Sequence, residues 1–93
     1  MTNGARGEVV VRLGGVERRL CLTLGALAEI ETGLGVQGLA GVAERMRALS
    51  ARDLIVVLAA LLRGGGEPAD AARAADPAEA ARAVARAFAA AAS

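Results

Sequence analysis

The feature that most constrains this fold is an unbroken apolar run at residues 54–62. Ser50 and Asp53 precede it with the spacing of a helix capping box, and glycines at 64–66 follow it as a stop. A helix over about 50–63 that is apolar on nearly every side must lie inside the fold or present a face to a partner. The run is well short of the roughly 18 residues that a membrane span needs, so we expect no membrane segment.

The N-terminal part of the chain has the pattern of a β-hairpin. Residues 8–13 and 16–24 are two mainly apolar runs, and Gly14-Gly15 between them suits the positive φ angles of a two-residue turn. Pairing across that turn makes one face apolar except for Arg18 near the turn, and it places Arg12 opposite Glu17 on the other face. Two strands alone are seldom stable, so we expect the hairpin to pack on helices or to pair with an edge of another chain.

Two segments between the hairpin and the apolar run have helical periodicity. Thr23 can cap a first helix over about 24–33, which ends at Gly33 and Gly35. A second, amphipathic helix is predicted over 37–49. Its apolar stripe consists of Leu39, Val42, Ala43, Met46 and Leu49.

Beyond the glycines at 64–66 the composition shifts towards alanine. Pro68 and Pro77 each suit the first turn of a helix, and Asp76 and Glu79 have the spacing of a second capping box. The last helix, over about 77–91, carries few large side chains, so its docking should contribute little free energy. We expect this C-terminal third to be the least stably packed part of the protein.

Together these elements predict an α+β fold, in which an N-terminal β-hairpin packs on a mostly helical bundle of four or five short helices. A chain of 93 residues has room for one core, so we expect a single domain over 1–93. It would consist of a hairpin at about 8–24, a helical part at about 24–63 and Ala-rich C-terminal helices at about 67–92. Because alanine buries little area, partner binding or self-association could supply further burial, and a homo-oligomer stays open.

The residue types exclude most catalytic chemistry. The chain has no histidine, so it cannot form a catalytic triad, a histidine base or a mixed Cys/His zinc site. Its one cysteine, Cys21, is better explained as a packed thiol than as a nucleophile. The glycines at 64–66 follow a helix and lack the Lys-Ser/Thr of a phosphate-binding loop. We predict no catalytic residue, no cofactor and no metal, and therefore no enzyme.

The charge pattern argues against nucleic-acid binding. The 11 basic residues are all arginine, and they are interspersed with 10 acidic residues to give a net charge of +1. Binding to a duplex normally needs a basic patch on one face. The sequence also begins without the charged-then-apolar layout of a signal peptide, so we expect a cytoplasmic protein.

Four short segments occur in a recognisable order within residues 7–66: LTLGALAEIE, then GLG, then LSARDL, then RGGG. In this order and spacing the chain resembles the gene transfer agent family, a phage-derived group linked to tail assembly. The resemblance implies a tail assembly chaperone that holds the tape-measure protein, or another tail protein, before the tube polymerises. Members are also labelled tail tube proteins, so the alternative is a structural tail component such as a tube or joining protein. A tube subunit needs a more substantial sheet than one hairpin.

A chaperone of this kind would lay an apolar groove along client helices. The residues assigned to such a partner contact are Val57 and Leu61 on the apolar helix and Val84 and Phe88 on the last helix. All four could instead be core residues, because the chain has few large apolar side chains.

Overall fold

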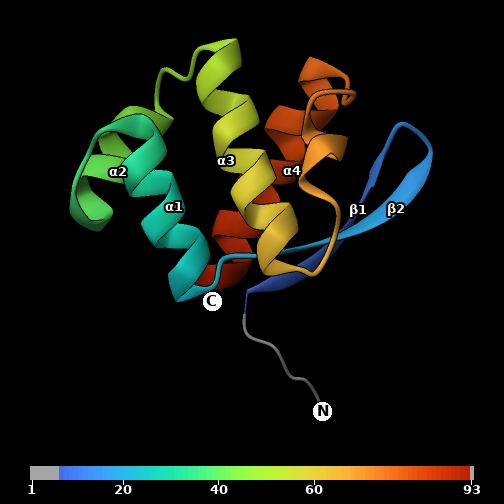
Figure 1. Cartoon of the computed structure of the whole chain (residues 1–93), viewed down its shortest axis with the longest axis horizontal. Coiled ribbons are helices and arrows are strands. Elements are labelled where there is room, and N and C mark those ends of the chain that lie inside the picture. The colour runs from blue at the N-terminus through green and yellow to red at the C-terminus, as the bar shows by residue number, and fades with distance from the viewer. Residues whose placement is uncertain (1–6, 93) are drawn as a thin grey trace.

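The computed structural model describes residues 7–92 and begins with an antiparallel hairpin that is followed by helices (Figure 1). The α+β prediction is confirmed. The elements in chain order are β1 (Glu8–Leu13), β2 (Val16–Cys21), α1 (Leu24–Leu34), α2 (Gly38–Met46), α3 (Ala51–Gly64), the 3₁₀ helix η1 (Ala69–Ala72) and α4 (Pro77–Ala92).

The hairpin forms around the predicted glycine turn. Gly14 and Gly15 have φ angles of 62° and 82°, which only glycine adopts readily, and the register places Leu13 opposite Val16. Arg12 lies opposite Glu17, as predicted, with 3.7 Å between their charged atoms. The turn is also attached to the helices, because the Gly14 N–H donates to Glu79 Oε1 over 3.0 Å.

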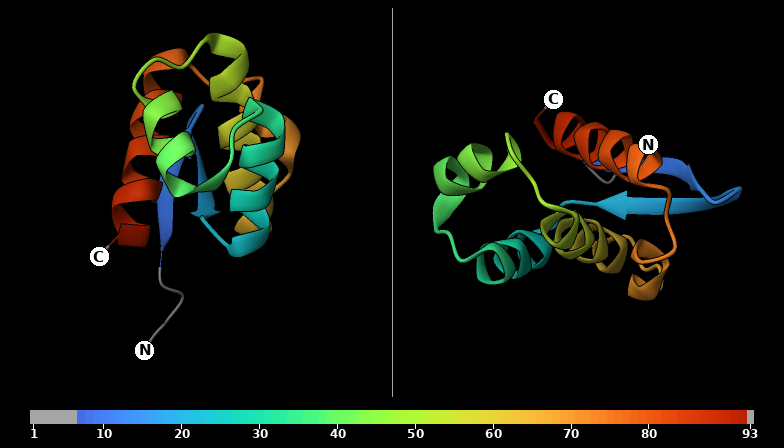
Figure 2. Two further views of the ribbon diagram at one scale, coloured as in Figure 1. Left: turned by 90° about the vertical axis from the view of Figure 1, so that its left-hand side faces the viewer. Right: turned by 90° about the horizontal axis from the view of Figure 1, so that it is seen from above.

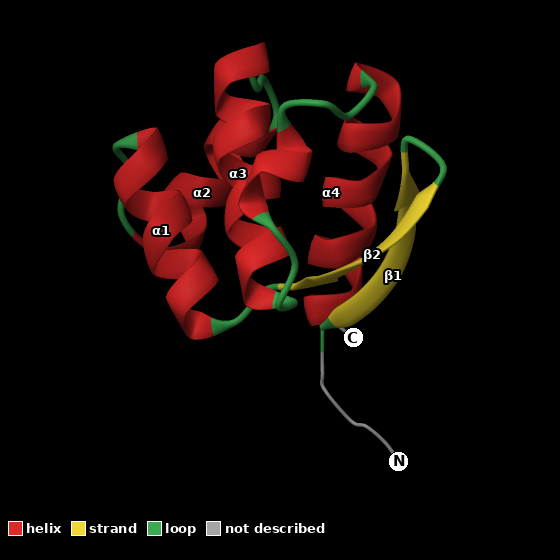
Figure 3. Ribbon diagram, turned by 45° about the vertical axis from the view of Figure 1, so that its right-hand side comes forward, coloured by secondary structure: helices red, strands yellow, loops and turns green. Residues whose placement is uncertain are grey.

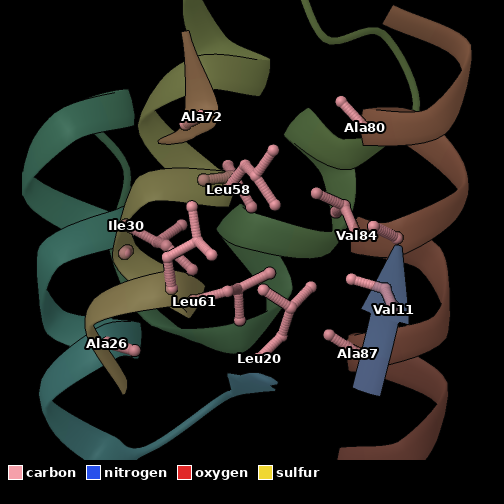
Figure 4. Close-up of a cluster of buried hydrophobic side chains, with 14 of the residues drawn as sticks. Val11, Leu20, Ala26, Ile30, Leu58, Leu61, Ala72, Ala80, Val84 and Ala87 are labelled. Carbon is pink, nitrogen blue, oxygen red and sulfur yellow. The ribbon is translucent and has the colours of Figure 1, made fainter. Parts of the chain in front are cut away.

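Helix α3 is the centre of the fold, as the sequence predicted. It packs against β2, α1, η1 and α4, and Figure 1 shows it between α1 and α4. Its side chains Leu58 and Leu61 are fully buried, and Figure 4 shows them among Leu20 of β2, Ile30 of α1 and Val84 of α4. The apolar character of α3 on nearly every side therefore reflects contacts on several sides.

The start of α3 is fixed by the predicted capping box. The Ser50 hydroxyl accepts a hydrogen bond from the Asp53 N–H at 3.1 Å, and the Asp53 carboxylate accepts from the Ser50 N–H at 3.5 Å. Asp53 is buried and pairs with Arg45 at 3.2 Å, while Arg45 Nη1 donates to the Leu34 carbonyl at 2.8 Å. One arginine thus joins the end of α1 to the start of α3.

The capping box predicted for α4 forms only in part. Asp76 accepts from the N–H groups of Ala78 and Glu79 at 3.0 and 3.1 Å, but the Glu79 carboxylate is bound to the hairpin turn. Helix α4 then runs beside β1, as Figures 2 and 3 show, and packs against α3. The residues it buries are Ala80, Ala83, Val84 and Ala87.

Helix α2 differs from its prediction in length and in burial. It ends at Met46, and of the predicted apolar stripe only Val42 is fully buried. Leu39 is 66% exposed and Ala43 is also exposed. The reason is that α2 packs mainly on α1, so one turn contacts the core while the first turn projects into solvent.

Candidate partner-binding surface

An open groove lies between α1 and α3. The two helices run antiparallel, since Glu29 of α1 contacts Arg63 near the end of α3, and Gly33 near the end of α1 contacts Val56. We call this surface the α1–α3 groove. Its lining residues are Ala28, Glu29, Thr32, Gly33, Ile55, Val56, Ala59 and Arg63.

The floor of the α1–α3 groove is built from small and β-branched side chains. A Cβ placed on Gly33 would overlap Cγ1 of Val56, so glycine is what allows the two helices to touch at this point. Ala28 is exposed, and Ile55, Val56 and Ala59 are only partly buried. Such a floor is shallow and mainly apolar, and it lets the backbone of another helix approach closely.

One end of the α1–α3 groove carries an ion pair. Arg63 Nη2 lies 2.7 Å from Glu29 Oε1, and the two side chains are 52% and 45% exposed. An ion pair this accessible to water contributes at most about 1 kcal/mol to folding. It therefore marks a polar boundary of the groove more than it stabilises the fold.

Leu24 extends the apolar surface beyond the groove. Leu24, Ala28 and Thr32 are spaced at four-residue intervals along α1, so they lie on one side of the helix. The Leu24 side chain is 84% exposed. It is held there by an ordered helix start, because the Thr23 hydroxyl accepts from the Ala26 N–H at 3.0 Å. A large apolar side chain that is exposed on an ordered helix start is the type of group that anchors a partner.

The four residues assigned to partner contact from the sequence lie elsewhere. Val57 and Leu61 are 0% exposed and Val84 is 2% exposed, so all three are core residues of the free chain. Phe88 is partly buried against the core and keeps some surface accessible. Their contact with a partner stays a prediction, and only for Phe88 does it require no rearrangement.

The groove residues were not identified from the sequence. The signal was present, because a helix that is apolar on nearly every side leaves an apolar face outward wherever its neighbours do not cover it. Which face of α3 that is depends on where α1 docks. Ile55, Val56 and Ala59 are therefore distinguished from Val57 and Leu61 only once the helices are placed.

The described residues offer little chemistry of other kinds. Within 7–92 no group of three or more Cys, Asp or Glu side chains is arranged to hold a metal ion. Burial raises the pKa of the Cys21 thiol, and the nearby Glu8 carboxylate adds to the rise, so the thiol is protonated at neutral pH. None of the helices in the described part of the chain is both long and apolar enough to cross a membrane.

Comparison with known proteins gives one family. Residues 6–93 match the family described as "Phage tail tube protein, GTA-gp10". No curated protein and no solved structure matches the chain. The match includes the hairpin, the helices described within residues 7–92 and the Ala-rich C-terminal part, whereas the resemblance seen in the sequence covers only residues 7–66.

Proposed function

The chain belongs to the gene transfer agent family of phage tail proteins, and from this premise we propose that it is a non-enzymatic tail assembly chaperone. Its client in this proposal is the tape-measure protein, which it binds during tail morphogenesis. The observation that carries the proposal is the α1–α3 groove, an open apolar surface with the exposed Leu24 at its side.

The groove suits a helical client. An amphipathic client helix would place apolar side chains spaced at i, i+3 and i+4 into a groove of this kind. Gly33, Ala28 and Ala59 give it room to approach, and the Glu29–Arg63 pair offers both signs of charge for polar contacts at one end. Full burial of Leu24 on binding would contribute about 2 kcal/mol, which is enough to make it a main anchor.

A structural tail component is the second candidate. The description of the matching family as a tail tube protein favours it directly. The two-stranded sheet of residues 7–92 speaks for the chaperone instead, because a ring of tube subunits is lined by more extensive sheet than one hairpin provides. The two candidates differ in where the protein is found, since a structural component stays in the finished particle and a chaperone leaves.

The first experiment is co-expression with the tape-measure protein of the same gene cluster, followed by pull-down and a blot of purified particles. We expect the chain to keep the tape-measure protein soluble, to co-purify with it and to be missing from particles. A chain that is abundant in particles and does not bind the tape-measure protein would replace the chaperone proposal with the structural one.

A groove variant tests the surface. Ala28→Arg places a long charged side chain over the floor of the α1–α3 groove at an exposed position, so the fold should be unaffected. We expect the amount of co-purified tape-measure protein to fall about tenfold or more, which corresponds to losing one well-placed apolar contact. Ala43→Arg, at an exposed position of α2 outside the groove, is the matched control and should bind like the wild type. Equal binding by both variants would exclude the groove as the client site, and Phe88→Ala would then test the last helix.

A further inference from the structure

The β1 strand has an open edge. In this register the odd-numbered residues of β1, from Val9 to Leu13, form the hydrogen-bonded pairs with β2. The backbone N–H and C=O groups of Glu8, Val10 and Arg12 therefore point away from β2. Within residues 7–92 no side chain and no other element forms a hydrogen bond with these groups. The Val10 side chain beside them is 49% exposed.

The opposite edge of the hairpin is closed by the chain itself. The outward N–H of Arg19 donates to Glu67 Oε2 at 3.1 Å. The Arg19 and Cys21 carbonyls lie directly against Gly65 and Gly64, where a Cβ on either glycine would overlap them. Among residues 7–92, these contacts leave β1 as the edge at which a further strand can join the sheet.

The side chains along the open edge are self-complementary. The outward face of β1 carries an acidic residue, Glu8, then an apolar one, Val10, and then a basic one, Arg12. In an antiparallel pair of two such strands centred on Val10, each Glu8 lies opposite the Arg12 of the other strand. The valines meet at the centre. The strand also has no proline, no lysine and no bulge, three devices that keep edge strands from pairing.

From this pattern we propose that β1 binds the β1 strand of a second copy of the chain, in antiparallel register about a two-fold axis at Val10. The result is a four-stranded sheet in the order β2, β1, β1, β2. Charges then alternate in sign across the outer face, because Arg12 already pairs with Glu17 at 3.7 Å and Glu8 with Arg19 at 3.5 Å within each hairpin.

The arginines of α4 near Arg12 would favour an acidic side chain from a strand paired with β1. A hollow next to β1 is lined by Arg12, Glu79, Arg82 and Arg86, among other residues, and so carries excess positive charge. In the proposed dimer the Glu8 carboxylate of the second copy lies beside Arg12 and offsets part of this positive charge. The proposal is independent of whether the protein is a chaperone or a structural component of the tail.

Charge reversal tests the register. The measurement is the dimer dissociation constant of the full chain by sedimentation equilibrium, with circular dichroism as the check on folding. Glu8→Arg and Arg12→Glu each place like charges opposite one another, so each variant alone should dimerise about tenfold or more weakly than the wild type. An equimolar mixture of the two should dimerise again, because every facing pair in the mixed dimer is of opposite sign. The double variant with both changes should also regain dimerisation.

Cross-linking tests the position of the axis. Two strands paired at Val10 bring its two Cα atoms to about 5.5 Å, within the span of a disulfide. Val10→Cys should therefore form a covalent dimer on mild oxidation. Val16→Cys is the matched control, because Val16 is 48% exposed but lies at the turn on β2, and it should not cross-link. A wild-type chain that stays monomeric, a mixture that fails to dimerise, or equal cross-linking at both positions would overturn the proposal.

Discussion

Gly64 and Gly65 let the end of α3 lie directly against the backbone of β2. A Cβ at Gly65 would overlap the Arg19 carbonyl, and one at Gly64 would overlap the Cys21 carbonyl. Only the third glycine of the run, Gly66, has a positive φ angle, of 80°. The sequence indicates a helix stop at this run, but the contact with β2 joins segments more than forty residues apart and leaves no local signal.

The contact makes Gly65 sensitive to the smallest substitution. We expect Gly65→Ala to lower the free energy of unfolding by about 1–3 kcal/mol, because the added methyl group forces β2 and α3 apart. Gly25→Ala is the control, since a Cβ there meets nothing nearer than Thr23 Oγ1 at 3.8 Å and should stabilise the helix by about 0.5–1 kcal/mol. Urea denaturation followed by circular dichroism measures both. Similar midpoints for the two variants would contradict the close approach.

Glu67 should make the stability of the fold depend on pH in the acidic range. A hydrogen bond from the Arg19 N–H, and then one from the Arg18 side chain, lower the pKa of Glu67 from its ordinary value of 4.5. A lowered pKa in the folded state stabilises the protein above about pH 4.5, and this stabilisation is lost as the pH falls through the lowered value. Glu67→Gln should therefore lower the Tm at pH 7, and the two proteins should converge as the pH falls below the lowered pKa of Glu67. A Tm difference that stays constant across this range would show that the charge of Glu67 plays no part.

Among the helices, α4 is attached to the rest of the fold mainly through small side chains. Its buried residues are Val84 and three alanines, and a Phe88 that stays partly exposed adds to them. The Glu79 bond to the hairpin turn holds its first turn. Helix α3, by contrast, buries four leucine and valine side chains completely.

Hydrogen exchange should reveal this difference. We expect backbone amides in the middle of α4 to exchange at least about tenfold faster than those in the middle of α3, because opening α4 exposes far less apolar area. Val84→Ala should widen the gap by raising exchange in α4 alone. Equal protection of both helices would show that α4 opens only when the whole fold unfolds.

The elements that the sequence predicted well are those with local signals. The hairpin turn follows from Gly14-Gly15, and the start of α3 follows from the pairing of Ser50 with Asp53. What the sequence could not give is which side of a helix its neighbours leave uncovered. Periodicity therefore places Leu39 on the apolar stripe although its side chain is exposed, and it does not reveal the groove lined by Ala28 and Val56. Glu79 was expected to cap its own helix, but a backbone N–H from a distant turn binds it instead.

At the scale of the whole molecule, hairpin and helices share one core. The Cα radius of gyration is 11.9 Å, close to the roughly 12 Å expected for a single compact domain of this length. Buried residues from both strands and from all four α-helices contribute to the same cluster. Within residues 7–92 this arrangement agrees with the proposal of a single domain.

One domain should unfold in one transition. We expect differential scanning calorimetry to give a single peak whose calorimetric and van't Hoff enthalpies agree, because the hairpin cannot keep its apolar face buried once α3 and α4 are lost. The measurement should be made at several protein concentrations, since self-association raises the Tm with concentration. Two resolved peaks, or a calorimetric enthalpy well above the van't Hoff value, would indicate separate folding units.

The closure of the β2 edge by Gly64, Gly65 and Glu67 also limits how the protein can grow. In the language of polymer chemistry, the sheet formed by residues 7–92 has a valence of one, because β2 is blocked and β1 is the edge left to accept a strand. Monomers with one reactive end form pairs and cannot form chains. Pairing through the folded strands therefore ends after a single step and cannot by itself extend into a filament.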